Sequence, residues 1–249
     1  MIRAVTFDFW DTLAVDDSDE PKRAAAGLLP KPAARRAAFA AEICAHHADI
    51  TTAAAEAAFE GANSWAKVRW KSDFVNPSVA QRVAEGYRLL ALAPTPGFAA
   101  LVGLLETMEV THPPELLPGA AEALAALAGR YTLGIISDTI VTPGRGLQAI
   151  LSGYGVLQHF TPAGLTFSDE VGRSKPHASI FQAACDGFQC APEEVVHIGD
   201  RESNDVTGPH RFGMKSVLFI GAVDRGSETS KADAICSRLT DLVDILGAL

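Results

Sequence analysis

The chain has 249 residues, of which 48% are apolar and 20% are charged, the composition of an ordinary globular protein. Its formal charge of -9 argues against nucleic acid as a general partner, because such a partner needs a basic patch. The sequence contains no run of about 18 apolar residues, so we expect no membrane span. It begins without an export signal, and its 4 cysteines lack metal-site or disulfide spacing, so we expect a cytoplasmic protein with reduced thiols.

The first predicted strand covers residues 2–7 and ends in a carboxylate, Asp8. Its β-branched and apolar residues are typical of a buried strand. In open α/β sheets, ligands bind outside the carboxyl ends of the strands, so an acid at this point is displayed to a substrate. For Asp8 taken alone, a turn or a helix cap is the alternative interpretation.

A long helical stretch follows a polar, acidic loop at residues 14–21. Alanine-rich segments separated by breakers predict helices over residues 32–48, 51–71, 76–92 and 95–109, with no strand between them. We therefore predict an all-helical cap domain over residues 16–113. Residues 1–15 and 114–249 would then form one α/β core domain.

Strands and helices alternate after residue 118. The pattern predicts strands over residues 131–136, 164–167, 195–198 and 216–220. It predicts helices over residues 119–129, 147–151 and 179–187, a helix that ends at 212, and a last helix over 239–246. Such alternation is typical of a parallel, doubly wound sheet with helices on both faces.

Polar residues follow three of the predicted strands, where the carboxyl ends of parallel strands share one edge. These are Asp8, the pair Ser137 and Asp138, and Asp200, and the basic loop that contains Lys175 lies between the last two in the chain. Carboxylates beside a lysine suit a hard divalent cation such as Mg²⁺ and an anionic group. Asp8 could attack as a nucleophile, while Ser137 and Lys175 stabilise the group that is transferred.

Four segments resemble, in order, the four motifs of the haloacid dehalogenase (HAD) superfamily: residues 7–13, 135–138, 175–176 and 197–205. The helical insertion sits where that superfamily carries its C1-type cap. The resemblance implies a doubly wound, Rossmann-like core, a helical cap and a hydrolase with an aspartate nucleophile.

The resemblance also implies roles for individual residues. The catalytic residues would be the nucleophile Asp8, Thr12 in the turn after it, Ser137 as a ligand of the transferred group, and Lys175. The magnesium ligands would be Asp8, the backbone carbonyl of Trp10, Asp200 and, directly or through water, Asp205. The substrate pocket would include Trp10, Asp138 and Thr139, although Asp138 stands where the family more often has Asn.

Trp10 departs from the phosphatases of this superfamily, which have a second Asp at this position as general acid and base. Such assistance typically contributes about 10²–10⁴-fold to the rate. We therefore expect Mg²⁺-dependent hydrolysis of a small, anionic phosphorylated metabolite that is slow for alkyl phosphates and faster for aryl or acyl phosphates. Asp11 is a conceivable substitute, but an adjacent residue should point elsewhere.

Two alternative functions remain open at this stage. A hydrolase that acts at carbon, like the 2-haloacid dehalogenases, is favoured by the aromatic residue at position 10. It is disfavoured by Asp200, where those enzymes have Ser and need no metal. The second alternative is a relative that binds ligands without catalysis.

Several cap residues are candidates for contacts with the substrate. The dehalogenases use an arginine early in the cap, and a related phosphonatase branch uses a cap lysine. The candidates here are Arg35, Arg36, Arg69, Arg82, Lys67 and Lys71. We expect Trp65 and Trp70 to pack in the core of the cap, with a position along the pocket as the alternative.

Overall fold

The computed structural model describes residues 1–249 and contains one parallel sheet of six strands. The strand order is β3-β2-β1-β4-β5-β6. The strands are β1 (Ala4–Phe7), β2 (Thr132–Ser137), β3 (Phe160–Phe167), β4 (Val195–Gly199), β5 (Lys215–Phe219) and β6 (Ala234–Cys236). The predicted α/β class with a parallel, doubly wound sheet is confirmed.

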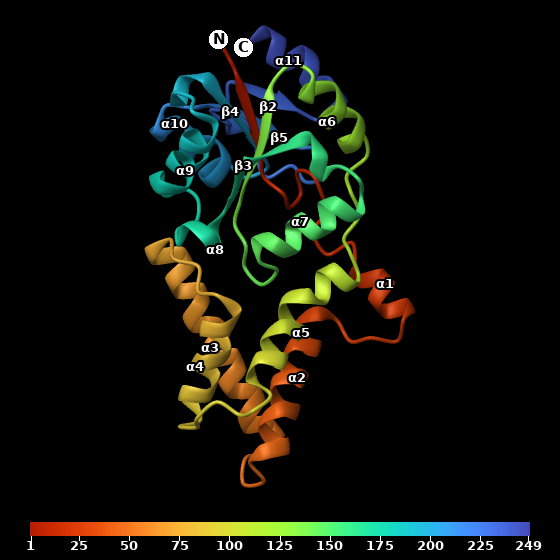
Figure 1. The fold of residues 1–249 in the computed structure, drawn as a ribbon, viewed down its shortest axis with the longest axis vertical. Coiled ribbons are helices and arrows are strands. Elements are labelled where there is room, and N and C mark those ends of the chain that lie inside the picture. The colour runs from red at the N-terminus through yellow and green to blue at the C-terminus, as the bar shows by residue number, and fades with distance from the viewer.

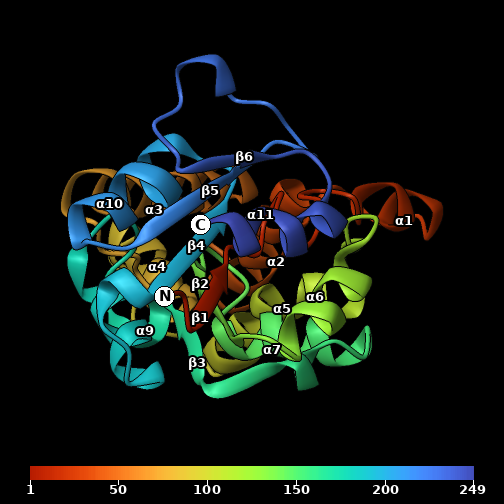
Figure 2. The same cartoon turned by 90° about the horizontal axis from the view of Figure 1, so that it is seen from above.

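Helices cover both faces of the sheet (Figure 2). On one face lie α9 (Ala178–Phe188) and α10 (Gly208–Phe212), and on the other α6 (Ala120–Ala128), α7 (Gly144–Gly153) and α11 (Leu242–Ala248). Alternate residues of β1 reach the two faces: Val5 and Phe7 enter the larger hydrophobic cluster, whereas Ala4 joins the cluster around Phe181. Since side chains alternate along a strand, a central strand buried on both sides is apolar throughout.

The helical insertion extends away from the end of the molecule that carries both termini (Figure 1). It contains α1 (Glu20–Ala25), α2 (Lys31–His46), α3 (Thr52–Asp73), α4 (Val79–Leu89) and α5 (Phe98–Thr111). Helices α2 to α5 share their own hydrophobic cluster, in which the Phe39 ring stacks on Phe59 at 5.2 Å and meets Tyr87 edge-on at 5.6 Å. The cap boundaries at residues 16 and 113 stay a prediction.

Two cap helices begin at side chains that supply hydrogen bonds to their first turns. The Thr51 side chain accepts a hydrogen bond from Ala54 N at 3.2 Å at the start of α3. Ser78 and Gln81 bond reciprocally at the start of α4, which forms a capping box. Such side chains satisfy amide groups that have no partner inside the helix, which explains why both helices begin near the predicted residues.

Several elements differ from the predicted ones. β3 begins at Phe160, not at 164, and its pairing with β2 shifts register between Leu133 and Ile135. A π-helical turn (Glu202–Thr207) precedes α10, and the last α-helix begins at Leu242. The elements that were not predicted are α1, α8 (Ser168–Val171) and β6, and 3₁₀ turns occur at Leu157–His159, Pro192–Glu194, Ser227–Thr229 and Leu239–Asp241. These elements are short or sit at the sheet edge, where periodicity gives little signal.

No helix in the structure combines the length and the apolar character that crossing a membrane requires.

Candidate active site

Asp8 lies directly after β1 and is held at one of its two carboxylate oxygens. Its backbone N–H donates to Ile198 O at 2.8 Å, which continues the pairing of β1 with β4. Oδ1 accepts a hydrogen bond from Phe9 N at 2.8 Å and lies 3.0 Å from Lys175 Nζ. No hydrogen bond from the protein reaches Oδ2, so this oxygen is available to a ligand.

Three carboxylates gather at the carboxyl edge of β1 and β4. One oxygen of each of Asp8, Asp200 and Asp205 lies within 4.8 Å of the others. Burial, and then the negative charges of Asp8 and Asp205, raise the pKa of Asp200 to about 7. Because each added negative charge is costly here, the cluster favours a cation, and its oxygen donors suit a hard divalent one. The Trp10 carbonyl accepts no hydrogen bond, and its part in holding a metal stays a prediction.

Lys175 supplies the positive charge inside this cluster. Its ammonium lies 2.6 Å from Asp205 Oδ1 and 3.0 Å from Asp8 Oδ1, and the residue is 3% exposed. Burial lowers the pKa of Lys175, but the charges of Asp205, Asp8 and Asp138 outweigh burial and hold the pKa above its ordinary value. Lys175 is therefore a buried cation beside the candidate nucleophile.

Three donors hold the two carboxylate oxygens of Asp205. Oδ1 pairs with Lys175 and with His197 Nε2 at 3.1 Å, and Oδ2 accepts from Arg201 N at 2.9 Å. Burial raises the pKa of Asp205, but the Lys175 charge and the His197 hydrogen bond hold it below its ordinary value. Gly199 makes room for this carboxylate, because a Cβ at position 199 would collide with Asp205.

Ser137 and Thr12 each bury a hydroxyl group that has no hydrogen-bond partner. Ser137 ends β2, and Thr12 lies in the turn after Asp8; both residues are fully buried. Buried polar atoms without partners are rare, and each needs an explanation, such as a ligand that completes the bond. Their contacts with a transferred group stay predictions.

Asp138 and Thr139 are occupied by protein contacts. Asp138 Oδ1 accepts from Lys175 N at 2.9 Å, so this side chain holds the loop that carries the lysine. Burial raises the pKa of Asp138 to about 6. Thr139 Oγ1 donates to Asp169 Oδ1 at 2.7 Å and lies 3.1 Å from Ser168 Oγ. A direct role for either residue in substrate binding stays a prediction.

Sequence reasoning missed Arg225, which lies in the connection between β5 and β6. Its guanidinium pairs with Asp200 and, through Nη2, with Asp11 Oδ2 at 2.7 Å. Asp11 adopts a left-handed backbone conformation (φ 53°), and its Oδ1 accepts from Asp16 N at 3.0 Å. Both oxygens of Asp11 are therefore engaged. No motif or periodic pattern around residue 225 indicates this contact.

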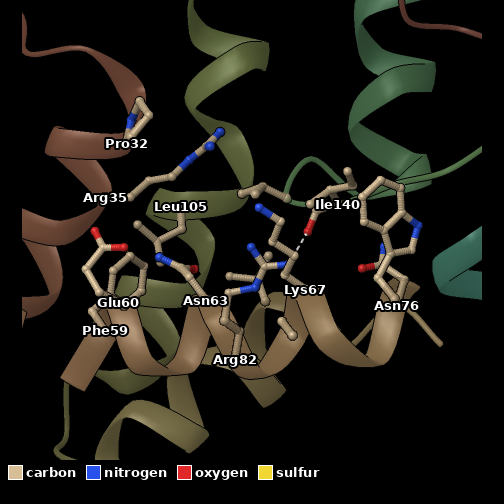
Figure 3. Close-up of a pocket in the computed structure, with 14 residues that line it drawn as sticks. Pro32, Arg35, Phe59, Glu60, Asn63, Lys67, Asn76, Arg82, Leu105 and Ile140 are labelled. Atoms are coloured by element: carbon tan, nitrogen blue, oxygen red, sulfur yellow. Dashed lines mark hydrogen bonds between the residues drawn. The ribbon is translucent and has the colours of Figure 1, made fainter. Parts of the chain in front are cut away.

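A cavity of about 190 Å³ lies beside Trp10, at the junction of the core and the cap. Trp10 is half-buried, with its ring edge-on to Phe9 at 4.8 Å. A second cavity of about 320 Å³ lies among the cap helices (Figure 3). The two share the lining residues Pro32, Arg35, Ile140 and Val141, so they lie next to each other.

The lining of the second cavity shows which of the candidate cap residues could contact a substrate there. Arg35, Arg82 and Lys67 line it, whereas Arg36, Arg69 and Lys71 do not. Trp70 also lines it, so the expectation that Trp70 packs in the cap core was wrong. Trp65 is likewise only half-buried, with the Arg69 guanidinium 5.6 Å from its ring centre. Neither tryptophan belongs to the hydrophobic cluster around Phe39, to which α3 contributes Ala55, Ala58 and Phe59 from its first half.

Comparisons with known proteins identify the family of the chain. A family model described as a haloacid dehalogenase-like hydrolase matches residues 2–213. A relative named glyceraldehyde 3-phosphate phosphatase, from Pyrococcus furiosus, is 36% identical over 104 residues, which cover 41% of this chain and 41% of the relative. The match thus spans less than half the length of that relative.

Two solved structures share the fold over nearly their whole length. A HAD phosphatase from Thermococcus onnurineus has a TM-score of 0.62 at 22% identity and covers 99% of this chain and 98% of its own. A 2-haloacid dehalogenase from Pseudomonas syringae has a TM-score of 0.62 at 18% identity and covers 100% of this chain and 99% of its own. Since one is a phosphatase and the other a dehalogenase, the fold alone does not choose between the two chemistries.

Proposed function

Because the chain belongs to the haloacid dehalogenase-like hydrolase family, we propose that it hydrolyses a small phosphorylated metabolite, with Asp8 as the nucleophile and Mg²⁺ as the cofactor. The observation that carries the proposal is the cluster of Asp8, Asp200 and Asp205, in which the ammonium of Lys175 pairs with Asp8 and Asp205. Three carboxylates with one internal lysine suit a divalent cation and a phosphate better than an uncharged haloalkyl group.

The magnesium ion would be held by Asp8, Asp200 and the carbonyl of Trp10, with Asp205 acting directly or through water. When bound, the ion supplies positive charge that stabilises the phosphoryl oxygens as the bond to the leaving group breaks. Asp205 also keeps Lys175 in place, because its Oδ1 lies 2.6 Å from the ammonium.

The chemistry of Asp8 has two steps. First, a carboxylate oxygen of Asp8 forms a bond to phosphorus while the bond from phosphorus to the leaving oxygen breaks, which gives an aspartyl-phosphate and the leaving group as an alkoxide, phenolate or carboxylate anion. An alkoxide or phenolate then takes its proton from water. Water then attacks the phosphorus, releases inorganic phosphate and regenerates Asp8. Lys175 orients the carboxylate throughout, and the unpartnered hydroxyls of Ser137 and Thr12 would donate to phosphoryl oxygens.

The leaving oxygen receives no proton from position 10, because an indole ring is no general acid. Asp11, the adjacent carboxylate, is paired with Arg225. We therefore propose that the preferred substrates have leaving groups that depart as anions, such as aryl or acyl phosphates, and that alkyl phosphates react slowly.

A dehalogenase-like reaction at carbon is the second candidate. The aromatic residue at position 10 and Arg35 in the cavity beside it favour this chemistry. Asp200 disfavours it, because a third carboxylate near Asp8 repels a carboxylated substrate unless a cation is present.

The test compares hydrolysis of phenyl phosphate with halide release from 2-chloropropionate, each with Mg²⁺ and with excess EDTA. We expect release of inorganic phosphate that requires Mg²⁺ and falls at least about a thousandfold in Asp8→Asn. Asp244→Asn, an exposed carboxylate on α11, is the matched control and should keep its activity. Halide release that persists in EDTA would establish the second candidate in its place.

A further inference from the structure

The second cavity, which lies among the cap helices and is called the cap cavity below, is lined by three cationic side chains and one acidic side chain. Arg35 comes from α2, Lys67 from α3 and Arg82 from α4, and Figure 3 shows them around the same hollow. The acid, Glu60, is engaged outside the cavity by Arg36 Nη1 at 3.1 Å. The space therefore presents an excess of positive charge, which attracts an anionic group.

Arg82 is the most informative of the three because it is buried without a carboxylate partner. The residue is 8% exposed, its Nη2 donates to Ile140 O at 2.8 Å, and its Nε has no hydrogen-bond partner. Burial, and then the charge of Arg35, lower the pKa of Arg82 to about 10, so it is still charged at neutral pH. Buried charges are normally paired, and an unpaired one is costly unless a ligand completes the site.

Arg35 links this cation to the region near Trp10. It lines both cavities, and its Nη2 lies 3.3 Å from Glu109 Oε1 while its Nε has no partner. Lys67 lines the same space and forms no ion pair. The walls between these cations are apolar and aromatic, formed by Phe59, Ala66, Trp70, Val79 and Leu105.

We propose that the cap cavity binds a second anionic group of the substrate, a carboxylate or a second phosphate, through Arg82 with Arg35 and Lys67. The substrate class is then a phosphate monoester whose far end carries a negative charge on an apolar or aromatic body. The inference rests on the proposed function for the identity of the transferred group. Arginine suits this task because its planar guanidinium can donate two parallel hydrogen bonds to one carboxylate or phosphate.

The dimensions of the cavity agree with this substrate class. Small-molecule sites of about 300–1,000 Å³ are typical, and the cap cavity alone measures about 320 Å³. It adjoins the smaller cavity, which is lined by Trp10, the second residue after Asp8 in the chain. A substrate of this class would extend from Asp8 past Trp10 to Arg82.

The experiment uses three probes that differ only at the distal position: phenyl phosphate, 4-carboxyphenyl phosphate and 1,4-phenylene bisphosphate. We expect kcat/KM of the wild type to be at least tenfold higher for one of the charged probes than for phenyl phosphate. In Arg82→Met this ratio should fall to near one, and Arg82→Lys should keep part of it. Arg69→Met, an exposed cap arginine outside the cavity, should keep the full ratio.

Binding separates this inference from the proposed function. The same probes are titrated calorimetrically into Asp8→Asn and into the double variant Asp8→Asn/Arg82→Met, with circular dichroism to verify folding. A preference for the charged probes that disappears with Arg82 supports the cap site even if no probe is hydrolysed. Equal affinity of Asp8→Asn for all three probes, or a preference that survives in the double variant with Arg82→Met, would overturn it.

Discussion

Arg225 Nη2 lies 2.7 Å from Asp11 Oδ2, and the same guanidinium pairs with Asp200, so one side chain bridges two acids from different strand ends. Arg225 is 214 positions from Asp11 in the chain. Because Arg225 engages Asp11, we expect that Asp11 does not supply the acid that is missing at position 10. It also brings a protein cation to Asp200, the carboxylate that we expect to bind Mg²⁺.

Removing Arg225 should therefore strengthen metal binding. In Arg225→Gln the guanidinium no longer competes for Asp200, and we expect the Kd for Mg²⁺ to fall by about three- to tenfold. Isothermal titration calorimetry with Mg²⁺ alone measures this directly. Arg211→Gln, an exposed arginine on α10, is the control for the loss of one positive charge. An unchanged or higher Kd in Arg225→Gln would show that the bridge does not oppose the metal.

Trp10→Asp should create the general acid that the site lacks. The side chain would stand two residues after Asp8, next to the cavity that Trp10 lines. We expect kcat for alkyl phosphates to rise by about 10–10⁴-fold, with a smaller rise for aryl phosphates. Trp10→Asn controls for the loss of the ring and its contact with Phe9. If both variants hydrolyse alkyl phosphates equally, proton donation at position 10 is not the limiting feature.

Asp138→Asn should stabilise the protein at alkaline pH. The pKa of Asp138 is raised from 3.8 to about 6 in the folded protein, so the folded state holds this proton more tightly than the unfolded state. Ionisation of Asp138 therefore lowers the free energy of unfolding as the pH rises from about 4 to about 6, and the free energy of unfolding stays lower above that range. We expect Asp138→Asn to raise the free energy of unfolding by about 1–3 kcal/mol at pH 8.

Urea denaturation at pH 4.5 and pH 8 measures this difference. The gain should be clearly smaller at pH 4.5, where Asp138 is protonated in the folded wild type. Asp244→Asn, which is exposed, should change the free energy of unfolding by less than about 0.5 kcal/mol at both values. A gain for Asp138→Asn that does not grow with pH would contradict the raised pKa.

Lys31→Met should destabilise the junction between core and cap. The buried Lys31 ammonium lies 2.6 Å from Asp19, 3.0 Å from Glu109 and 3.1 Å from Asp17. These ion pairs join the start of α2 to the segment before α1 and to the end of α5. Removal of the ammonium leaves the buried Asp19 without a cationic partner and leaves Glu109 with Arg35 alone. We expect the free energy of unfolding at pH 7 to fall by about 3–5 kcal/mol.

The matched control for Lys31 lies on the same helix. Arg36 pairs with Glu60 at 3.1 Å and with Glu56 at 3.9 Å, but all three side chains are more than one-third exposed. Arg36→Met should therefore cost less than about 1 kcal/mol in the same denaturation measurement. Similar losses for the two variants would show that burial does not set the strength of the Lys31 cluster.

The sequence by itself determined the architecture and the centre of the site. Continuous apolar strands alternating with helices predict a parallel sheet, because strands buried on both faces must be apolar throughout. The polar residues Asp8, Ser137 and Asp200 interrupt those runs at the strand ends, and parallel strands bring these ends to one edge. The local pattern and the strand direction were therefore enough to predict Asp8 as the candidate nucleophile and Asp200 as a carboxylate beside it.

Only the tertiary structure decided what surrounds that centre. Arg225 reaches Asp11 and Asp200 from a connection without any motif, and Arg82 is buried in a cavity that four cap helices and the 140–141 segment close together. The expected helical pattern of α3 did not show that Trp70 lines this cavity, because periodicity reports which residues share a face and not what that face meets. Contacts between segments far apart in the chain depend on packing, and packing leaves no local signal in the sequence.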